Sequence, residues 1–464
     1  MDKNSDFKID LLLINPATIS IQNNPIPFGL TYLASFLEKK GFSVKLLDLG
    51  VDYMDDESLI NYIKGIKPRN IGFGCMTVHV DFVKRITKKI KENIDVKIFV
   101  GGIHPTSFKE KNFDDFKDVD IIFIGEGELT LLEVLQGKKL SNIKGIAYKD
   151  KGKVRVNEIR ELIEDIDILP FPARHLLDSN KYALSFDWEG RNPSTTMFTS
   201  RGCPYNCIYC ASKVMWRRKV RFRSAENVLN EIDFLIKECG VREILFYDDH
   251  FTLNKERLYK ICNGLLERKY DLTWGCLSRV DSLDLETLRL MKKAGCHIIS
   301  FGVESGSQTT LNSMKKDVKV EDIKRAFALC RETGINTKAT FIFGAPKETR
   351  ETINETRNLI KVIKPDYVWF FIMTPMPGTE LYDLHQKIGL GCTEWNMYNQ
   401  TGYNKFYDTD LDYNILKKEV SRAYRGYYLS ADYIFSQLRK INSRKIRVWL
   451  RILRYLPSVL KTLK

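Results

Sequence analysis

Residues 201–210 read RGCPYNCIYC and place Cys203, Cys207 and Cys210 in one short loop with the spacing Cys-x3-Cys-x2-Cys. Thiolates are the ligands that hold iron–sulfur clusters, and a cubane 4Fe–4S cluster has four irons to ligate. Three thiolates from one loop leave one iron open, where a substrate or cofactor can bind. The spacing therefore predicts a 4Fe–4S cluster with one open iron.

Two other interpretations of this loop are a zinc knuckle completed by a distant histidine and three unrelated core thiols. A structural zinc site takes four closed ligands, usually from two Cys-x2-Cys pairs. No second pair exists, because the remaining cysteines all stand singly: Cys75, Cys239, Cys262, Cys276, Cys296, Cys330 and Cys392. The spacing favours the cluster over both alternatives.

The loop resembles the cluster loop of radical S-adenosylmethionine (SAM) enzymes. The resemblance implies that Tyr209, just before the last cysteine, lies near the adenine of SAM. It also implies that the open iron chelates the amino and carboxylate groups of SAM, whose reductive cleavage releases a 5′-deoxyadenosyl radical. In such enzymes the cofactors carry the radical chemistry, and the protein supplies position and electrostatics.

Composition sets the broad class of the protein. A length of 464 residues predicts about two to three domains, and 44% hydrophobic and 28% charged residues are typical of a globular chain. No signal peptide and no uncharged apolar span long enough for a transmembrane helix is found. Ten cysteines without paired spacing therefore favour the reducing cytoplasm.

The net charge of +14 is concentrated at the C-terminus, where residues 439–464 hold nine Lys or Arg and no acid. Apolar and basic residues there fall on opposite faces of a helix: Ile446, Trp449, Leu450 and Leu453 against Arg444, Arg447, Arg451 and Arg454. Such a helix predicts peripheral contact of residues 440–464 with the inner face of a membrane. The alternative is a helix packed on its own protein. No recognised nucleic-acid-reading module is found, which argues against nucleic acid as a partner.

The first part of the chain alternates short apolar strands with amphipathic helices such as Leu30–Lys39 and Phe82–Glu92. Strands are predicted at Ile9–Ile14, Val44–Leu47, Ile71–Phe73, Lys97–Val100 and Ile121–Ile124. This β-α alternation predicts a Rossmann-like, doubly wound parallel sheet. Its ligand should bind beyond the carboxyl ends of the strands.

A dinucleotide site would place Gly-x-Gly-x-x-Gly after the first strand, but NPATISIQNNPIPFG follows instead, which argues against NAD and FAD. The motifs Asn15-Pro16, Pro27-x-Gly29-Leu30, GGIHP and GEGE resemble the cobalamin-binding domain found ahead of many radical SAM domains. The residues implied to contact cobalamin are Asn15, Pro27, Gly29, Thr77, Gly101, Gly102, His104, Gly125, Glu126 and Glu128. The Asp-x-His-x-x-Gly loop that supplies a cobalt ligand in other cobalamin proteins is missing, so we interpret His79 and His104 as structural residues.

The β/α alternation resumes at residue 195 and predicts a partial, six-stranded (β/α)6 barrel of the TIM type. The predicted strands are Thr196–Thr199, Glu243–Tyr247, Leu272–Gly275, Ile298–Gly302, Lys338–Phe343 and Tyr367–Ile372. The predicted helices cover residues 224–238, 254–268, 284–294, 320–333 and 348–363. In such barrels the chemistry lies at the carboxyl ends of the strands.

Charged residues at these strand ends match the two charged groups of SAM. Asp248 or Asp249 is expected to accept hydrogen bonds from the ammonium group, and Arg279 to bind the carboxylate. The alternative for the aspartates is a helix N-cap, and one of the two is expected to do only that. His250 and Cys276 are candidates to face the substrate.

The ribose and adenine of SAM are assigned to the next strand ends. Glu304 is expected to accept hydrogen bonds from the ribose, with a buried salt bridge as the alternative interpretation. Gly344 and Pro346 follow the fifth strand, where the backbone, together with Tyr209, is expected to hold adenine. The strings FYDDHFT, FGVESGSQ and FIFGAP resemble the radical SAM motifs at these strands.

We expect a cobalamin-binding domain at residues 1–160, closed by a hairpin over 145–156, and a connecting segment at 161–190. The barrel is expected at residues 191–390. A helical cap over the barrel mouth is predicted at residues 391–464, with helices from about 413 to 437.

By resemblance, this layout implies an enzyme that transfers a methyl group to an unactivated carbon of a small molecule. An oxidative cyclase or rearrangement enzyme is the alternative, as in the anaerobic cyclase of chlorophyll synthesis. A cobalamin or iron–sulfur carrier is the non-enzymatic alternative, but a carrier needs no SAM-binding groups at several strand ends. The basic C-terminal helix suggests a lipid substrate, and the resemblance implies an electron donor of the ferredoxin or flavodoxin type.

Overall fold

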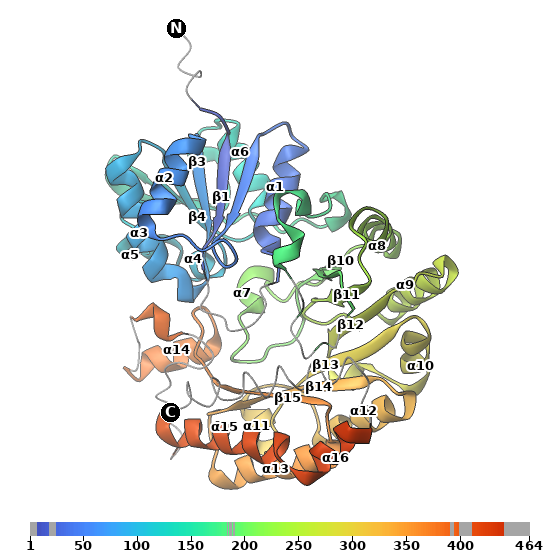
Figure 1. Ribbon diagram of the computed structural model, residues 1–464. Coiled ribbons are helices and arrows are strands. Elements are labelled where there is room, and N and C mark those ends of the chain that lie inside the picture. Colours follow the sequence, from blue (N-terminus) through green and yellow to red (C-terminus); the bar gives the residue numbers. More distant parts are fainter. Residues whose placement is uncertain are drawn as a thin grey trace.

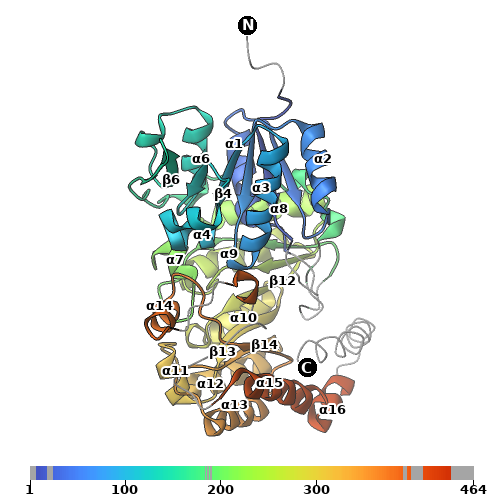
Figure 2. The same ribbon diagram turned by 90° about the vertical axis from the view of Figure 1, so that its left-hand side faces the viewer.

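The computed structural model describes residues 7–17, 25–182, 184, 188, 191–389, 394–398 and 411–439. The basic segment 440–464 lies outside these residues. Two α/β units are stacked on one another, with the N-terminal part of the chain, in blue, forming the upper unit (Figures 1 and 2). No helix among the described residues is long and apolar enough to cross a membrane.

The upper unit is a seven-stranded sheet with strand order β2-β1-β3-β4-β5-β6-β7. The first five strands are parallel, and β6 and β7 add the predicted hairpin as an antiparallel edge. The strands are β1 (Leu11–Asn15), β2 (Val44–Asp48), β3 (Asn70–Gly74), β4 (Lys97–Gly101), β5 (Ile121–Phe123), β6 (Ile146–Asp150) and β7 (Lys153–Val156). The order reverses between β1 and β3, the place where doubly wound sheets bind their ligands.

Helices cover both faces of this sheet because its strands are apolar on both sides. One face packs against α1 (Phe28–Glu38) and α6 (Glu128–Leu135). The other face packs against α2 (Asp56–Ile66) and α3 (Val80–Asn93). The short helices α4 (Ile103–Phe108) and α5 (Asn112–Asp115) follow β4. The predicted doubly wound fold is confirmed.

The lower unit is a six-stranded parallel half-barrel whose strands neighbour one another in chain order. The strands are β8 (Ser194–Met197), β11 (Glu243–Phe246), β12 (Thr273–Ser278), β13 (Cys296–Glu304), β14 (Asn336–Phe343) and β15 (Tyr367–Ile372). The outer helices are α8 (Ala225–Cys239), α9 (Lys255–Arg268), α10 (Leu285–Lys293), α12 (Val320–Thr333) and α13 (Arg350–Ile363). All lie close to the predicted positions, so the predicted partial barrel is confirmed.

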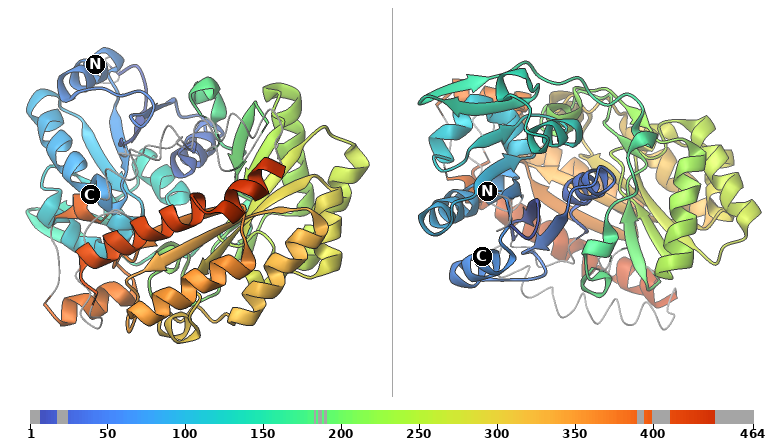
Figure 3. Two further views of the ribbon diagram at one scale, coloured as in Figure 1. Left: turned by 60° about the horizontal axis from the view of Figure 1, so that its bottom comes forward. Right: turned by 90° about the horizontal axis from the view of Figure 1, so that it is seen from above.

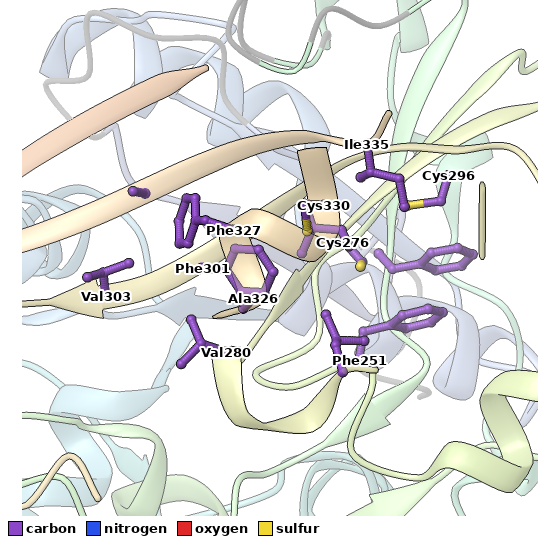
Figure 4. Packing of buried hydrophobic residues seen from close by; sticks show 14 of the residues in the cluster. Phe251, Cys276, Val280, Cys296, Phe301, Val303, Ala326, Phe327, Cys330 and Ile335 are labelled. Atoms are coloured by element: carbon purple, nitrogen blue, oxygen red, sulfur yellow. The ribbon is translucent and has the colours of Figure 1, made fainter. Parts of the chain in front are cut away.

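The core between strands and outer helices is aromatic and rich in thiols (Figure 4). Phe251, Phe301 and Phe327 pack there with Cys276 and other buried cysteines. Cys276 was a candidate to face the substrate. That expectation is wrong, because Cys276 is fully buried in this apolar core between β12 and the outer helices.

The C-terminal helices do not cap the barrel mouth. Helix α15 (Tyr413–Tyr428) packs alongside β15 in the outer helical layer, and α16 (Ala431–Arg439) follows it (Figure 3, red). β15 is an edge strand, and the backbone N–H groups of Phe370 and Val368 donate to the hydroxyls of Tyr424 and Tyr428 at 3.0 and 3.1 Å. The helix therefore protects the open edge of the half-barrel.

An earlier segment lies between the two units instead. It contains α14 (Glu380–Lys387) and the single turn Trp395–Met397. The indole N–H of Trp395 donates to Asp115 of the upper unit at 3.0 Å. The backbone carbonyl of Pro377 accepts a hydrogen bond from Ser107 at 3.0 Å.

The covering of the β15 edge by α15 can be tested by removing the hydroxyl groups. Tyr424→Phe leaves a buried backbone N–H without its partner, so we expect the free energy of unfolding to fall by about 1–3 kcal/mol. Urea-induced unfolding followed by circular dichroism measures this change. Tyr53→Phe, at a side chain that is 83% exposed, serves as the control. An equal effect of the two substitutions would contradict the packing.

Candidate cluster and cofactor site

The cysteine loop is closed at its base by a small antiparallel ladder. Strand β9 (Ser200–Arg201) enters the loop and β10 (Arg221–Phe222) leaves it, with Arg201 opposite Arg221. Gly202 has φ +98°, and a Cβ there would lie 2.2 Å from the carbonyl oxygen of Lys219. Only glycine fits this position, so the chain turns sharply into the first cysteine.

The three thiols are free, and they offer the donor set that the predicted cluster needs. Cys207 is buried, whereas Cys203 and Cys210 are half-buried. Burial raises the pKa of the Cys210 thiol to about 11. Among the described residues, no three side chains of His, Cys, Asp or Glu are arranged to hold a single metal ion. A cubane cluster does not require that arrangement, because each thiolate binds a different iron.

Asp248 holds the residues that lead into the cysteine loop. Its carboxylate accepts four hydrogen bonds of 2.5–2.9 Å, from the backbone N–H and hydroxyl groups of Thr199 and Ser200. The side chain is fully buried, and burial raises its pKa. Asp248 is therefore buried and bonded to the residues that enter the loop, which argues against the expected contact with the SAM ammonium.

Asp249 is the exposed member of the pair and accepts a hydrogen bond from the Ser212 hydroxyl, at the start of α7 (Ser212–Trp216). Neither aspartate caps a helix, because Asn254 provides the N-cap of α9. Of the two carboxylates, Asp249 is the one that remains open to a ligand.

Arg279 also differs from its expected role. Its guanidinium donates to the Asp281 carboxylate and to the backbone carbonyls of Lys316 and Asp317 at 2.8–3.1 Å. It lies 3.5 Å from the ring centroid of Tyr205 in the cysteine loop. The N–H groups of the Arg279 guanidinium are thus used mainly to hold the loop. This contradicts a bidentate contact between the guanidinium and the SAM carboxylate. The sequence alone could not show this, because Lys316 and Asp317 lie far along the chain.

His250 lies beneath the same loop, 1% exposed, with its ring 6.0 Å from that of Tyr205. Burial lowers the pKa of His250 to about 4, so the imidazole is neutral. His250 is therefore buried against the cysteine loop and does not lie on an open surface.

Glu304 lies at the end of β13 with φ +65°, beside a β-bulge. Its carboxylate pairs with the ammonium of Lys316 at 3.0 Å, and both side chains are buried. The structure therefore shows the buried salt bridge of the alternative interpretation, and the expected contact of Glu304 with the ribose stays a prediction. Lys316 is a site residue that the sequence reasoning missed, since nothing in its local pattern marks it.

The structure brings Tyr209 close to the loop after β14. Tyr209 packs against a small apolar cluster that includes Ala345, which lies between Gly344 and Pro346. The backbone N–H of Gly344 donates to the carboxyl group of Glu348, whose pKa burial raises to about 8. The expected adenine-binding residues therefore lie together, and Glu348, which the sequence reasoning missed, shapes their loop.

At the upper unit, two glycines near the carboxyl ends of the strands lie beside open space. A Cβ added at Gly29, in α1, or at Gly125, after β5, would meet no atom within 4 Å. Asn15 donates to Asp48 at 2.8 Å, across the ends of β1 and β2. Pro27 precedes α1 as its N-cap residue. These open glycines at the carboxyl edge fit the close approach of cobalamin.

The turn after β4 is tight. Gly101 ends β4, and Gly102 has φ +117°, where a Cβ would lie 2.7 Å from the carbonyl oxygen of Cys75. Gly102 is therefore required for the approach of β4 to the end of β3.

The two histidines at this edge, His79 and His104, are buried. The ring of His104 bonds to the Thr77 hydroxyl at 3.3 Å and lies 5.0 Å from the ring of Trp395. Burial lowers the pKa of His104 to about 4. Nδ1 of His79 accepts a hydrogen bond from the backbone N–H of Met76. The buried positions of Thr77 and His104 argue against the cobalamin contacts assigned to them.

Glu126 and Glu128 do not face the open edge either. Arg201 donates to Glu126 at 2.6 Å and to Glu128 at 2.7 Å, and Arg221 donates to both oxygens of Glu126 at 2.8–2.9 Å. The four side chains are only 3–13% exposed. The pKa of Glu126 would rise on burial, but Arg201 and Arg221 hold it below its ordinary value. The predicted cobalamin contact is wrong for both glutamates. They form an interdomain ion cluster with Arg201 and Arg221.

The interdomain ion cluster predicts a large cost for removing one charge. Glu126→Gln leaves two buried guanidinium groups without a full counter-charge, so we expect a loss of about 3–5 kcal/mol in the free energy of unfolding. Glu133→Gln is the matched control, because Glu133 pairs with Lys138 and Arg160 at a half-buried site of the same unit. That control should lose about 1 kcal/mol or less.

Chemical denaturation monitored by tryptophan fluorescence compares the two variants. A loss in E126Q no larger than that in E133Q would contradict a buried ion cluster between the units.

Comparisons with known proteins identify the family to which this chain belongs. Residues 197–360 match the model of the radical SAM superfamily, and residues 14–135 match that of the B12 binding domain. An uncharacterised methyltransferase of Pyrococcus horikoshii is 34% identical to this chain, over 80% of this chain and 82% of the relative. The anaerobic magnesium-protoporphyrin IX monomethyl ester cyclase of Rubrivivax gelatinosus is 28% identical, over 92% and 78% of the two chains.

The fold is shared with a solved structure. The cobalamin-dependent SAM radical enzyme OxsB, with aqua-cobalamin bound, superposes with a TM-score of 0.75 at 20% identity, covering 98% of this chain and 72% of that chain. The chain belongs to the radical SAM superfamily and carries a B12-binding domain ahead of its radical SAM domain. It is an enzyme whose family cofactors are a 4Fe–4S cluster, SAM and cobalamin.

Proposed function

We propose that this enzyme transfers a methyl group to an unactivated carbon of a small-molecule substrate, in a cobalamin-dependent radical SAM reaction. The interdomain ion cluster carries the proposal. It joins the residues that follow β5 in the B12-binding unit to Arg201, two residues before Cys203. A radical source and a methyl donor must reach the same substrate, so their two sites have to adjoin. The relative from Pyrococcus horikoshii, which bears the name of a methyltransferase, supports the same reaction.

The residues of the chain have separate roles in the proposal. When bound, the cluster, SAM and cobalamin supply the electron transfer, the radical and the methyl group. Cys203, Cys207 and Cys210 hold the cluster. The exposed carboxylate of Asp249 accepts hydrogen bonds from the SAM ammonium, and Glu304 accepts them from the ribose.

The adenine end of SAM is assigned to Tyr209 and to the backbone at Gly344 and Pro346. The open edge at Gly29 and Gly125 receives cobalamin. We assign cobalamin binding to residues 1–160 and SAM and cluster binding to residues 191–390, with 161–190 connecting them.

Release of 5′-deoxyadenosine tests the proposed radical step. The reconstituted protein should release it under argon when SAM and dithionite are added, because reduction of the cluster drives cleavage of SAM. Cys203→Ala, Cys207→Ala and Cys210→Ala should each abolish release. Cys239→Ala, at an exposed cysteine outside the loop, should release it like the wild type. Continued release by the loop variants would show that these cysteines do not hold the cluster.

Oxidative cyclisation is the second candidate, and the Rubrivivax cyclase, which aligns with 92% of this chain, favours it. SAM with an isotopically labelled methyl group separates the two reactions. Methyl transfer carries the label into the product, whereas cyclisation yields an unlabelled product that has lost hydrogen.

We further propose a cytoplasmic enzyme that is reduced by a protein of the ferredoxin or flavodoxin type and acts on a lipid at the membrane surface. The basic, amphipathic sequence of residues 440–464 supports the membrane contact. The full-length chain should float with vesicles that contain anionic lipid, and a chain ending at residue 439 should not. Equal flotation of the two chains would refute the contact.

A further inference from the structure

Lys316 occupies an unusual backbone setting beside the cysteine loop. The backbone N–H of Ile208 donates to the carbonyl of Met314 at 3.0 Å, so the two loops are directly joined. Lys315 and Asp317, on either side of Lys316, both have φ +52°. Left-handed conformations at non-glycine residues are strained and persist only when the surroundings impose them, which is common at functional sites. Here they stand on either side of the buried Lys316.

The two neighbouring lysines end in opposite environments. Lys316 is 7% exposed. The side chain of Lys315 is 51% exposed and pairs with Glu380 on the surface at 2.7 Å. Burying an ammonium group costs several kcal/mol even when it is paired, so the Lys316–Glu304 pair is weak evidence for stability. Stability alone therefore does not explain why Lys316 is buried, and we look for its role at the cysteine loop.

The buried charges around Lys316 lie next to the cysteine loop. Burial lowers the pKa of Lys316, but Glu304 and Cys207 raise it, and the net shift is upward. The guanidinium of Arg279 donates to the backbone carbonyl of Lys316 at 3.1 Å and lies 3.5 Å from the ring centroid of Tyr205 in the cysteine loop. Two buried cations therefore lie beside the cysteine loop, Arg279 against the ring of Tyr205 and Lys316 in the loop that is bonded to Ile208. One of them, Arg279, is bonded to Asp281, and the other is balanced by Glu304.

We propose that Lys316 tunes the reduction potential of the cluster: its buried ammonium stabilises the reduced cluster on Cys203, Cys207 and Cys210. This inference rests on the proposed function, because it requires the cluster on this loop. Reduction moves one electron from the external donor to the cluster, oxidises the donor, and makes the cluster more negative by one charge without breaking a bond. Nearby charge and burial set the potentials of such clusters. A cation inside the protein acts more strongly than one in water.

Glu304 opposes this effect, since its carboxylate cancels part of the field of Lys316. The two residues therefore predict shifts of opposite sign, which a merely structural ion pair does not. Lys316→Met should lower the reduction potential, and Glu304→Gln should raise it. Lys315→Met is the matched control, because it removes an equal charge from the exposed side of the same loop.

The test is a redox titration of the full-length, anaerobically reconstituted proteins without SAM, with electron paramagnetic resonance reporting the reduced cluster. At the midpoint potential of the wild type, K316M should show a tenfold lower ratio of reduced to oxidised cluster, equal to a shift of 59 mV for one electron. E304Q should shift the ratio toward the reduced cluster, and K315M should match the wild type.

K316M with full iron content and the wild-type midpoint would overturn the inference. If K316M does not retain its iron, E304Q decides: a midpoint at or below that of the wild type overturns the inference, and a higher one supports it. A wild-type protein that holds no reducible cluster would instead contradict the proposed function itself.

Discussion

The buried ion cluster between Glu126, Glu128, Arg201 and Arg221 is the constraint on which the rest of the structure depends. Charges taken out of water are stable only when they are paired and hydrogen-bonded. Here the carboxylates come from the loop after β5 and the guanidinium groups from the two strands at the base of the cysteine loop. Neither unit can move relative to the other without leaving buried charges unpaired. The distance between the B12-binding edge and the cysteine loop is set by this cluster.

The cysteine loop is then fixed from its other sides by groups of the barrel. Asp248 bonds to the residues that enter the loop. Arg279 lies against the ring of Tyr205. The backbone of Met314 bonds to Ile208. Two of the charged residues at these strand ends, Asp248 and Arg279, therefore position the loop. The carboxylate of Asp249 is the one that stays exposed near the cysteines.

The fold and the cysteine loop could be predicted from the sequence because both leave local patterns. Apolar strands alternating with amphipathic helices gave both sheets, and the spacing of three cysteines gave the cluster site. The partners of charged residues leave no such pattern. Glu126 and Arg221 are far apart in the chain, and so are Asp248 and Thr199, so only the folded structure could pair them. The same holds for α15, whose apolar face suits a cap or an outer layer equally well. In the folded structure, the hydroxyls of Tyr424 and Tyr428 accept hydrogen bonds from the backbone of β15. These bonds place α15 in the outer layer.

The central claim is that three thiolates from one loop hold a cluster with one iron open to SAM. Mössbauer spectroscopy of protein reconstituted with iron-57 tests it most directly. The account predicts a cubane cluster in which the signal of a single iron changes when SAM is added. A protein that holds zinc in place of iron, or a cluster in which no iron responds to SAM, would contradict it.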